Sequence, residues 1–216
     1  MERTSPLQIL ARLLPCIVVF VPCACRSTRI QDVSLLESPG VLRAATSLEQ
    51  QSVWQQRVIA HWGDAEAYGF DAVIQRAGES LTILGLSPAG SVGFSIVLSE
   101  GEVELVNNMP DDFPFPPRNV LMDVQRAFYP WLASGTTEGI VDGERIAEIW
   151  SEGKLVERTF SRLDGAPAGI ITIRYEWGDN NAYIPASTVL ENGWFDYKLE
   201  IETQRETLLD SSGEPE

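Results

Sequence analysis

The sequence has few of the side chains that carry local catalytic and metal chemistry. It contains one histidine, His61, and its three cysteines, Cys16, Cys23 and Cys25, all lie near the N-terminus. A disulfide scaffold or a zinc site needs such residues spread through the fold, so neither is expected after Cys25. No Gly-x-Ser-x-Gly elbow and no phosphate-cradling glycine loop occurs. We therefore predict a protein that is not an enzyme and that uses no metal and no cofactor.

Basic side chains are also scarce. The chain carries 16 Lys and Arg against 31 Asp and Glu, which gives a net charge of -15. Nucleic acids attract clustered Lys and Arg, and the absence of any such cluster excludes nucleic acid as an expected partner. The acidic charge also argues against electrostatic docking on anionic lipid headgroups, and it favours the solubility of an exported protein.

The N-terminal apolar run is too short to cross a bilayer. It extends from Leu13 to Val21, whereas a spanning helix needs about 20 apolar residues. Arg3 and Arg12 precede or flank it, and small residues follow it. A basic start, a short apolar core and small residues before a break are typical of an exported signal peptide. We predict that residues 1–24 form this peptide.

The segment Val21-Pro22-Cys23-Ala24-Cys25 resembles a bacterial lipobox, in which a cysteine becomes the lipidated N-terminus. Cys25 is the better acceptor because the small Ala24 precedes it, whereas Pro22 precedes Cys23. Arg26 follows in place of Asp, which favours the outer membrane over retention at the inner membrane. We predict a lipoprotein anchored through Cys25 in the outer membrane and facing the periplasm. The alternatives are lipidation at Cys23 or an ordinary cleaved signal peptide.

Composition divides the rest of the chain into three parts. Residues 25–52 are polar and show no sustained period, as expected of a lipidated N-terminus and tether. Residues 53–203 carry strand patterns and are long enough for one well-packed domain. Residues 204–216 are polar and acidic, and we expect a disordered tail.

The domain is expected to be mainly β. From Phe70 to Val106, apolar residues recur at every second position, which is the period of a half-buried strand. Tight turns separate these runs, so the strands form an antiparallel meander. A second strand region runs from Glu144 to Thr203 and ends in a hairpin about Asn192-Gly193, the commonest type I′ pair. About ten strands are predicted, and they begin at Val53.

One main helix is predicted, from Val120 to Leu132. Its apolar residues fall on one broad stripe at helical spacing, with Asn119 as the N-cap and with Pro130 disturbing the last turn. A single apolar-striped helix between strands lies against a sheet face, where it closes a barrel mouth or fills the interior. The stripe alone is compatible with plain core and with a lid over a ligand.

A proline-rich loop precedes the helix, from Asn108 to Pro117. Its prolines lack the backbone donor that an interior strand needs, so it is expected to be a rigid loop. Phe113 and Phe115 form its apolar tip and are candidates for contact with a membrane or a ligand. The alternative is that both rings pack down on the sheet.

Three segments resemble the lipoprotein localisation proteins LolA and LolB or their relatives. The turn from Leu84 to Gly90, with the strand from Phe94 to Leu98, is similar to the third and fourth strands of those proteins. The proline-rich loop leading to Phe128-Tyr129-Pro130-Trp131, and the hairpin from Asn192 to Leu199, are similar to an uncharacterised group of LolB-like bacterial lipoproteins. That group is often associated with aryl-polyene and related fatty-acid-type gene clusters. The likeness covers most of residues 50–203.

The resemblance implies a half-open antiparallel β-barrel whose concave face is covered by helix and encloses a cavity for acyl chains. It implies binding of a lipid or a lipoprotein acyl group at the outer membrane, without turnover. The insertion receptor of the family carries a large apolar residue at the tip of its membrane-touching turn, where this chain has Ala89. Ala89 and the acidic surface favour a specialised lipid or polyene-lipid binding role over general lipoprotein insertion.

These inferences together predict a non-enzymatic lipoprotein that binds, and carries or inserts, an acyl chain or lipid-linked small molecule. A periplasmic carrier protein is a candidate partner. The expected cavity lining is Phe94, Ile96, Leu98, Val124, Phe128 and Trp131. The alternative is a structural or assembly lipoprotein whose barrel interior is solid core. A third hypothesis is an enzyme acting on the acyl chain, which needs a polar cluster inside the cavity around His61.

Overall fold

The structure is a computed structural model that describes residues 37–63, 66–87, 89–109, 115–178 and 183–209. All of these residues fall in the unit from Gln31 to Glu216. The predicted signal peptide, the lipidation site Cys25 and the loop residue Phe113 lie outside the described residues, so they stay predictions.

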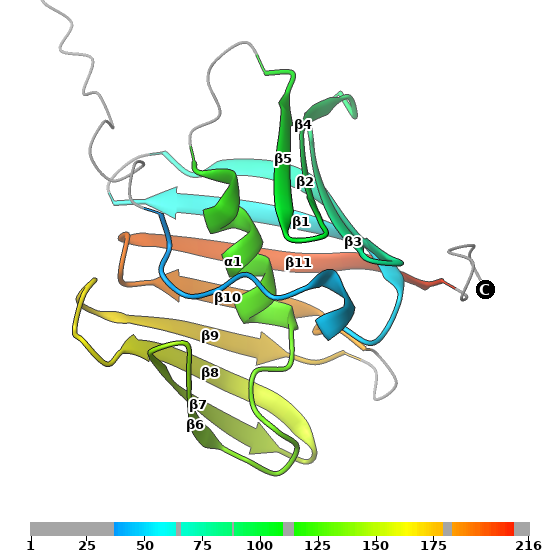
Figure 1. Cartoon of the computed structure of the whole chain (residues 1–216). Helices are drawn as coiled ribbons and strands as arrows, with labels where there is room; N and C mark the ends of the chain where they lie inside the picture. The colour runs from blue at the N-terminus through cyan, green and yellow to red at the C-terminus, as the bar shows by residue number, and fades with distance from the viewer. Residues whose placement is uncertain (1–36, 64–65, 88, 110–114, 179–182, 210–216) are drawn as a thin grey trace, which may run out of the picture. The chain divides into compact units, whose positions relative to one another are not determined.

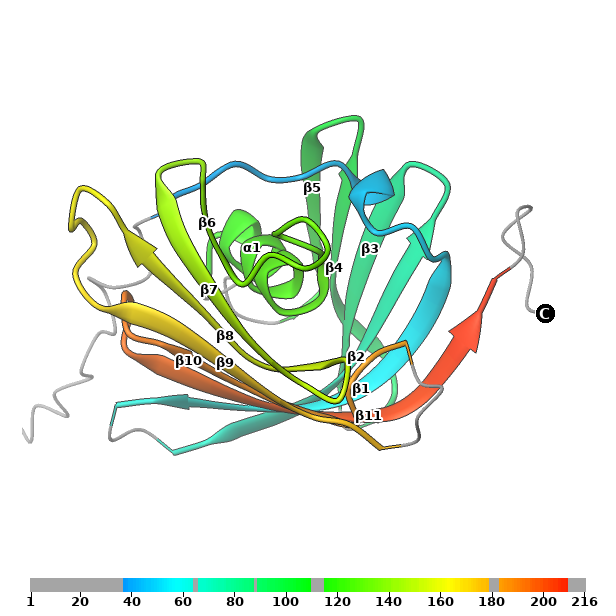
Figure 2. The ribbon, with the colours of Figure 1, turned by 90° about the horizontal axis from the view of Figure 1, so that it is seen from below.

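The strands form one antiparallel sheet that curls around a single α-helix. Their bounds are β1 Ser52–Trp62, β2 Tyr68–Ala77, β3 Ser80–Leu86, β4 Val92–Ser99, β5 Glu102–Asn107, β6 Glu138–Val141, β7 Glu144–Ser151, β8 Lys154–Arg162, β9 Ile170–Glu176, β10 Ser187–Asn192 and β11 Tyr197–Leu208. The strand order is β5-β4-β3-β2-β1-β11-β10-β9-β8-β7-β6. Figures 1 and 2 show the resulting half-open barrel with the helix on its concave side. The predicted fold class is confirmed, with one more strand among the described residues than the sequence suggested. The disordered tail predicted from residue 204 is wrong up to Leu208, because β11 continues to that residue in its pairing with β1.

Alternation along β1 places one set of side chains inside the curve. Trp54, Gln56, Val58 and Ala60 are buried, and the residues between them are more exposed. Gln56 is the polar member of this buried set. Its exposed fraction is only 1%, and its amide donates to the Thr203 hydroxyl at 3.4 Å. The period of two in the sequence therefore identifies the concave face correctly.

Three hairpins close through two-residue turns in which both residues have positive φ. They are Glu100-Gly101 with φ of 53° and 83°, Asp142-Gly143 with 51° and 77°, and Glu152-Gly153 with 52° and 78°. This pair of values is that of type I′ turns, whose twist matches the twist of the strands they join. Glycine at the second position adopts positive φ without steric cost, which explains why each acidic residue is followed by glycine.

The helix α1 runs from Pro117 to Phe128. Its N-cap is Pro116, and Pro117 occupies the first helical position, where the missing proline N–H costs no hydrogen bond. The predicted start at Val120 with an Asn119 N-cap is therefore wrong. The Asn119 side chain instead accepts a hydrogen bond from the Ser38 N–H at 2.6 Å.

The helix also ends earlier than predicted. Tyr129 is extended, with φ -87° and ψ 151°, because a residue that precedes proline avoids the helical region. Pro130 therefore terminates the helix rather than disturbing its last turn. Trp131 and Leu132, which the sequence placed on the helical stripe, lie beyond it.

The segment from residue 37 to residue 51, here called the strap, crosses the open side of the half-barrel over α1 (Figure 2). Arg43 and Gln125 bond reciprocally: the Arg43 N–H donates to the amide oxygen at 2.8 Å, and the amide donates to the Arg43 carbonyl at 2.7 Å. Arg118 donates to two further strap carbonyls at 2.7 and 2.5 Å. The tether predicted for residues 25–52 can therefore include only residues before Glu37.

The last hairpin differs from the predicted type I′ turn. Asn192 ends β10, and four residues, Gly193 to Asp196, form the loop before β11. The Asn192 side chain caps this loop by accepting from the N–H groups of Trp194 and Phe195 at 3.1 and 3.2 Å. Trp194, expected in a strand, thus lies in the loop with its side chain buried.

Candidate functional site

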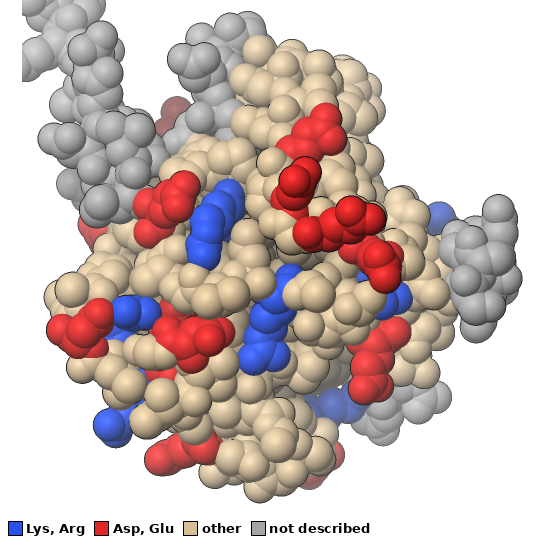
Figure 3. Space-filling view, viewed as in Figure 1, with Lys and Arg blue, Asp and Glu red and all other residues tan. Residues whose placement is uncertain are grey.

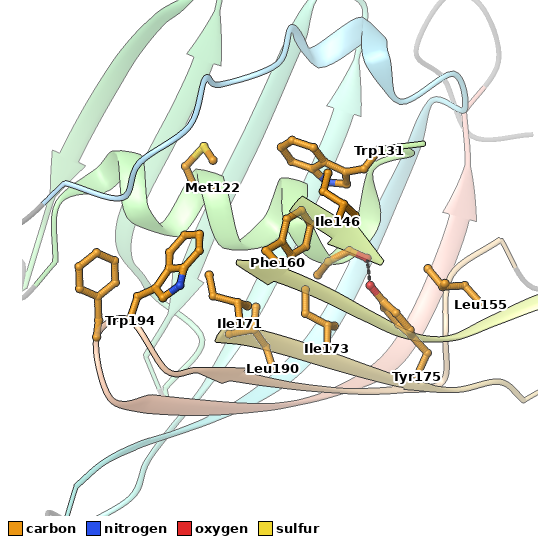
Figure 4. Packing of buried hydrophobic residues seen from close by; sticks show 12 residues of the cluster. Met122, Trp131, Ile146, Leu155, Phe160, Ile171, Ile173, Tyr175, Leu190 and Trp194 are labelled. Atoms are coloured by element: carbon orange, nitrogen blue, oxygen red, sulfur yellow. Dashed lines mark hydrogen bonds between the residues drawn. The ribbon is translucent and has the colours of Figure 1, made fainter. Parts of the chain in front are cut away.

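Three apolar clusters fill the concave side of the sheet around α1. The first lies against β7 to β10 and is drawn in Figure 4. The second lies against β1 to β4, and the third, formed by Val58, Ala72 and Ile201, lies on β1, β2 and β11. Phe128 packs against all three clusters, and its ring centroid is 5.2 Å from that of Trp54. The three apolar clusters therefore meet at Phe128, the last residue of α1.

The predicted lining residues all lie in this interior. Five of them, Phe94, Ile96, Leu98, Val124 and Phe128, belong to or pack against the second cluster. Trp131 belongs to the first cluster, where its ring meets that of Phe160 edge-on at 5.2 Å. The structure thus places the six side chains in two adjoining groups, and Phe128 contacts both groups. Their role as ligand contacts stays a proposal.

These residues differ in how completely the protein itself covers them. Ile96 and Leu98 are 0% and 1% exposed, so they are fully enclosed by other side chains. Phe94, Val124 and Phe128 are only half-buried, although they face the interior. The half-buried group is where an apolar ligand has surface left to cover.

Aromatic rings continue from this half-buried group to the end of the sheet where β1 ends and β2 begins. Phe94 lies 6.2 Å from Phe70, and Phe70 lies 5.9 Å from Tyr68. Phe115 stacks on Trp62 at 5.1 Å with an interplanar angle of 19°. We call these five residues the aromatic rim. Phe115 therefore packs on the sheet, which is the alternative that the sequence left open, and membrane contact by Phe115 stays a prediction.

Two of the hollows on the described surface are lined by residues of the sheet and its turns, and the second includes Tyr175, a buried member of the first cluster. One, of about 370 Å³, is lined by Val97, Ser99, Glu102, Val103 and Glu104. The other, of about 540 Å³, is lined by Ser151, Glu152, Lys154, Val156, Tyr175, Trp177 and Gly178. Neither contains a predicted lining residue.

Side chains from the sheet hold the C-terminal end of α1. Arg158 donates to two carbonyls there at 2.8 and 3.0 Å, and it pairs with Glu148 at 2.8 Å. The Tyr175 hydroxyl donates to the Ala127 carbonyl at 2.9 Å (Figure 4). Burial raises the pKa of Tyr175 to about 12, so the hydroxyl remains a donor. A cation near the last carbonyls also complements the helix dipole.

A fully buried ion pair joins α1 to β7. Arg126 and Glu144 are 0% and 1% exposed, and their closest atoms are 3.0 Å apart. Arg126 also donates to the Ser38 hydroxyl at 2.7 Å and lies over the Trp194 ring at 4.7 Å. Burial raises the pKa of Glu144 above its usual value, although Arg126 opposes the change. The pair orients the helix, the strap and the sheet together.

Asp123 is the other buried acid of the helix. The Tyr197 hydroxyl donates to Asp123 Oδ2, and Asn192 donates to the Tyr197 hydroxyl at 2.8 Å. Burial raises the pKa of Asp123 to about 6, although the Tyr197 hydroxyl and Arg126 favour the charged form. Burial and the neighbouring Asp123 raise the pKa of Tyr197 well above its usual value. The group joins the helix to the last hairpin.

Within the described residues, no three His, Cys, Asp or Glu side chains come close enough to hold a metal ion. His61 lies on β1, and its Nε2 is 3.7 Å from a carboxylate oxygen of Glu200, with both side chains partly exposed. No helix in the described part of the chain is long and apolar enough to cross a membrane.

Sequence reasoning missed the polar residues that position the helix. Asp123 and Arg126 are three residues apart, so they share one helical face, and both are buried there. Charged residues on the buried side of a helix could have signalled partners across the interior. The identities of those partners, Glu144 and Tyr197, depend on the tertiary fold.

The fold places the chain in the class of half-open antiparallel barrels that wrap one helix. Within that class, the chain belongs to the DUF3261 family, described as a protein of unknown function, whose model matches residues 53–205. No curated protein sequence matches the chain.

The solved structures that are similar to the chain include two with low sequence identity to it. A LolA superfamily protein from Nitrosomonas europaea has a TM-score of 0.46 and 12% identity, covering 78% of this chain and 94% of that one. A DUF1329 family protein from Desulfovibrio piger has a TM-score of 0.42 and 14% identity, covering 75% of this chain and 89% of that one.

Proposed function

We propose that this domain binds an acyl chain or a lipid-linked small molecule without chemical turnover. The observation that carries the proposal is the half-buried apolar group inside the curve, Phe94, Val124 and Phe128, which continues into the aromatic rim. Each methylene that leaves water for such a surface contributes about 0.8 kcal/mol, so an acyl chain needs no specific polar contact to bind.

The N-terminal sequence supports an outer-membrane location for this binding. A lipid on Cys25 would attach the domain to the outer membrane, facing the periplasm, where acyl ligands arrive from other carriers or membranes. The domain itself then supplies an apolar surface between membrane and solvent. Delivery by a periplasmic carrier protein is part of the same proposal.

The alternative, a structural lipoprotein with a solid core, is favoured by a different observation. Ile96, Leu98 and Trp131 are 0%, 1% and 5% exposed, so half of the predicted lining is already enclosed by protein. Under this alternative the half-buried residues are only the margin of the core, and no ligand binds.

A substitution that fills space distinguishes the two functions. Val124→Phe adds volume at the half-buried face of α1, and Leu98→Phe adds it in the enclosed core. Overpacking an enclosed site costs about 1–3 kcal/mol of unfolding free energy. If Val124 faces ligand space, we expect Val124→Phe to cost much less than Leu98→Phe and to weaken binding of a fluorescent fatty acid by delipidated protein at least tenfold.

Val156→Phe provides the control, because Val156 is half-buried on β8 outside the three clusters. It should change neither probe binding nor stability appreciably. A native protein that fails to bind the probe after delipidation, together with equal costs at Val124 and Leu98, would support the solid core. Native mass spectrometry of protein purified from membranes would identify a retained lipid directly.

A further inference from the structure

The strand β5 forms one edge of the sheet. It pairs with β4, and no other strand in the described ranges runs along its outer side. It has six residues, which corresponds to about 20 Å of backbone. It contains neither proline nor lysine, the residues that commonly protect an edge from an added strand. A free edge of this kind presents backbone donors and acceptors in a row.

The other edge of the sheet offers much less. The strand β6 has only four residues. Leu132 lies over its centre so closely that a Cβ at Gly139 would stand 2.6 Å from the leucine side chain. Of the two edges, β5 is therefore the longer one and the better candidate to accept another strand.

The register with β4 assigns the two faces of β5. Val103 and Leu105 lie opposite Leu98 and Ile96, which are buried, so they face the concave side. Glu102 and Glu104 alternate with them and face the convex side. The strand therefore presents apolar side chains on one face and carboxylates on the other.

The carboxylates make this edge strongly acidic. Glu102 and Glu104 line the hollow of about 370 Å³ whose wall also includes Val97. Glu100 in the adjoining turn is exposed as well. None of the three forms an ion pair within the part of the chain that the structure describes. Figure 3 shows acidic side chains gathered over this region.

We propose that β5 is a docking strand for an extended protein segment with Lys or Arg at alternate positions and apolar residues between them. Such a segment would add to the sheet through backbone hydrogen bonds. Its basic side chains would lie beside Glu102 and Glu104, because cross-strand neighbours on one face are about 5 Å apart. A second copy of this chain is a poorer occupant, because its own β5 brings the same carboxylates. The inference is independent of acyl binding.

A labelled peptide with the core Lys-Val-Lys-Val-Lys-Val provides the probe, and Lys-Lys-Lys-Val-Val-Val provides the control of equal charge. We expect the alternating peptide to bind the full-length protein more tightly than the blocked one by fluorescence anisotropy. We also expect it to slow amide hydrogen exchange in residues 102–107. Equal binding of the two peptides, or binding without added protection in β5, would overturn strand addition.

The double variant Glu102→Lys/Glu104→Lys tests the charge requirement. Exposed ion pairs are individually weak, but reversing two of them should weaken binding of the alternating peptide about tenfold. Glu176→Lys/Glu202→Lys changes the net charge equally at exposed sites on β9 and β11, and it should leave binding nearly unchanged. Equal losses in both double variants would mean that net charge alone attracts the peptide, and would overturn the assignment to β5.

Discussion

Phe94 lies across Gly85 on the neighbouring strand, at a distance that leaves no room for a side chain. A Cβ on Gly85 would stand 2.0 Å from the phenyl ring, well inside van der Waals contact. The glycine at this position of β3 therefore sets the place of an aromatic ring that belongs both to the interior and to the aromatic rim.

We expect Gly85→Ala to displace Phe94 and to lower the unfolding free energy by about 1–3 kcal/mol. Urea unfolding measures this change. Gly93→Ala is the matched control on β4, because its nearest neighbours would be 3.5 Å from the new methyl group. Equal stability of the two variants would mean that Phe94 moves aside without cost.

The buried pair between Arg126 and Glu144 gives a second prediction. Arg126→Met removes the closer cation of the buried Glu144 and leaves only Arg162, whose Nη1 lies 4.0 Å from the carboxylate. Breaking a buried pair typically costs about 3–5 kcal/mol. The double variant Arg126→Met/Glu144→Gln removes the carboxylate charge as well, so we expect it to unfold less readily than the single variant. A double variant no more stable than the single one would contradict this account of the pair.

Asp123 should make stability depend on pH. Its pKa rises on folding from 3.8 to about 6, so between these values the folded protein holds a proton that the unfolded chain has lost. The stabilisation is complete below the lower value, declines as the pH rises, and is lost above about pH 6, a change of about 3 kcal/mol.

We expect Asp123→Asn to be more stable than the native protein at neutral pH and to show a flatter pH dependence. Urea unfolding from about pH 4 to about pH 8 measures both effects. Asp196→Asn removes one exposed charge from the neighbouring hairpin and serves as the control. An unchanged pH profile for Asp123→Asn would show that another group titrates.

The strap provides a fourth prediction. Gln125→Leu removes both hydrogen bonds to the Arg43 backbone, so the Arg43 N–H and C=O lose their partners. Each such group that is shielded from water lowers the unfolding free energy by about 1–3 kcal/mol. We expect faster hydrogen exchange in residues 38–48 while the sheet stays protected. Gln75→Leu, at an exposed position on β2, should leave the strap unchanged. Normal exchange in the strap of Gln125→Leu would show that the other contacts suffice.

Local patterns were enough to predict the strands and the position of the helix between them. Alternation along β2 and β4 identified the inward residues, and Gly-containing turns marked the hairpins. Where a prediction from the sequence was wrong, a longer-range contact or a side-chain cap determined the local structure. Asn192 was interpreted through its dipeptide with Gly193, but its side chain caps a longer loop.

The candidate site was predictable only in part. Inward apolar residues such as Ile96 and Val124 follow from periodicity, but the degree to which each is covered depends on packing. The strap residue Arg43 showed no periodic signal, because its backbone bonds to a side chain of α1 and not to a strand. Contacts of that kind leave no regular pattern in the sequence.

The pairing of β1 with β11 has a consequence for how the chain acquires its structure. Ser52 lies opposite Leu208 and Trp62 opposite Tyr197, so the centre of the sheet joins residues from opposite ends of the domain. Contacts between distant segments close slowly, because the loop entropy must be lost before they stabilise the fold. A chain synthesised in N-to-C order therefore cannot complete its central ladder until residues 197–208 have been made.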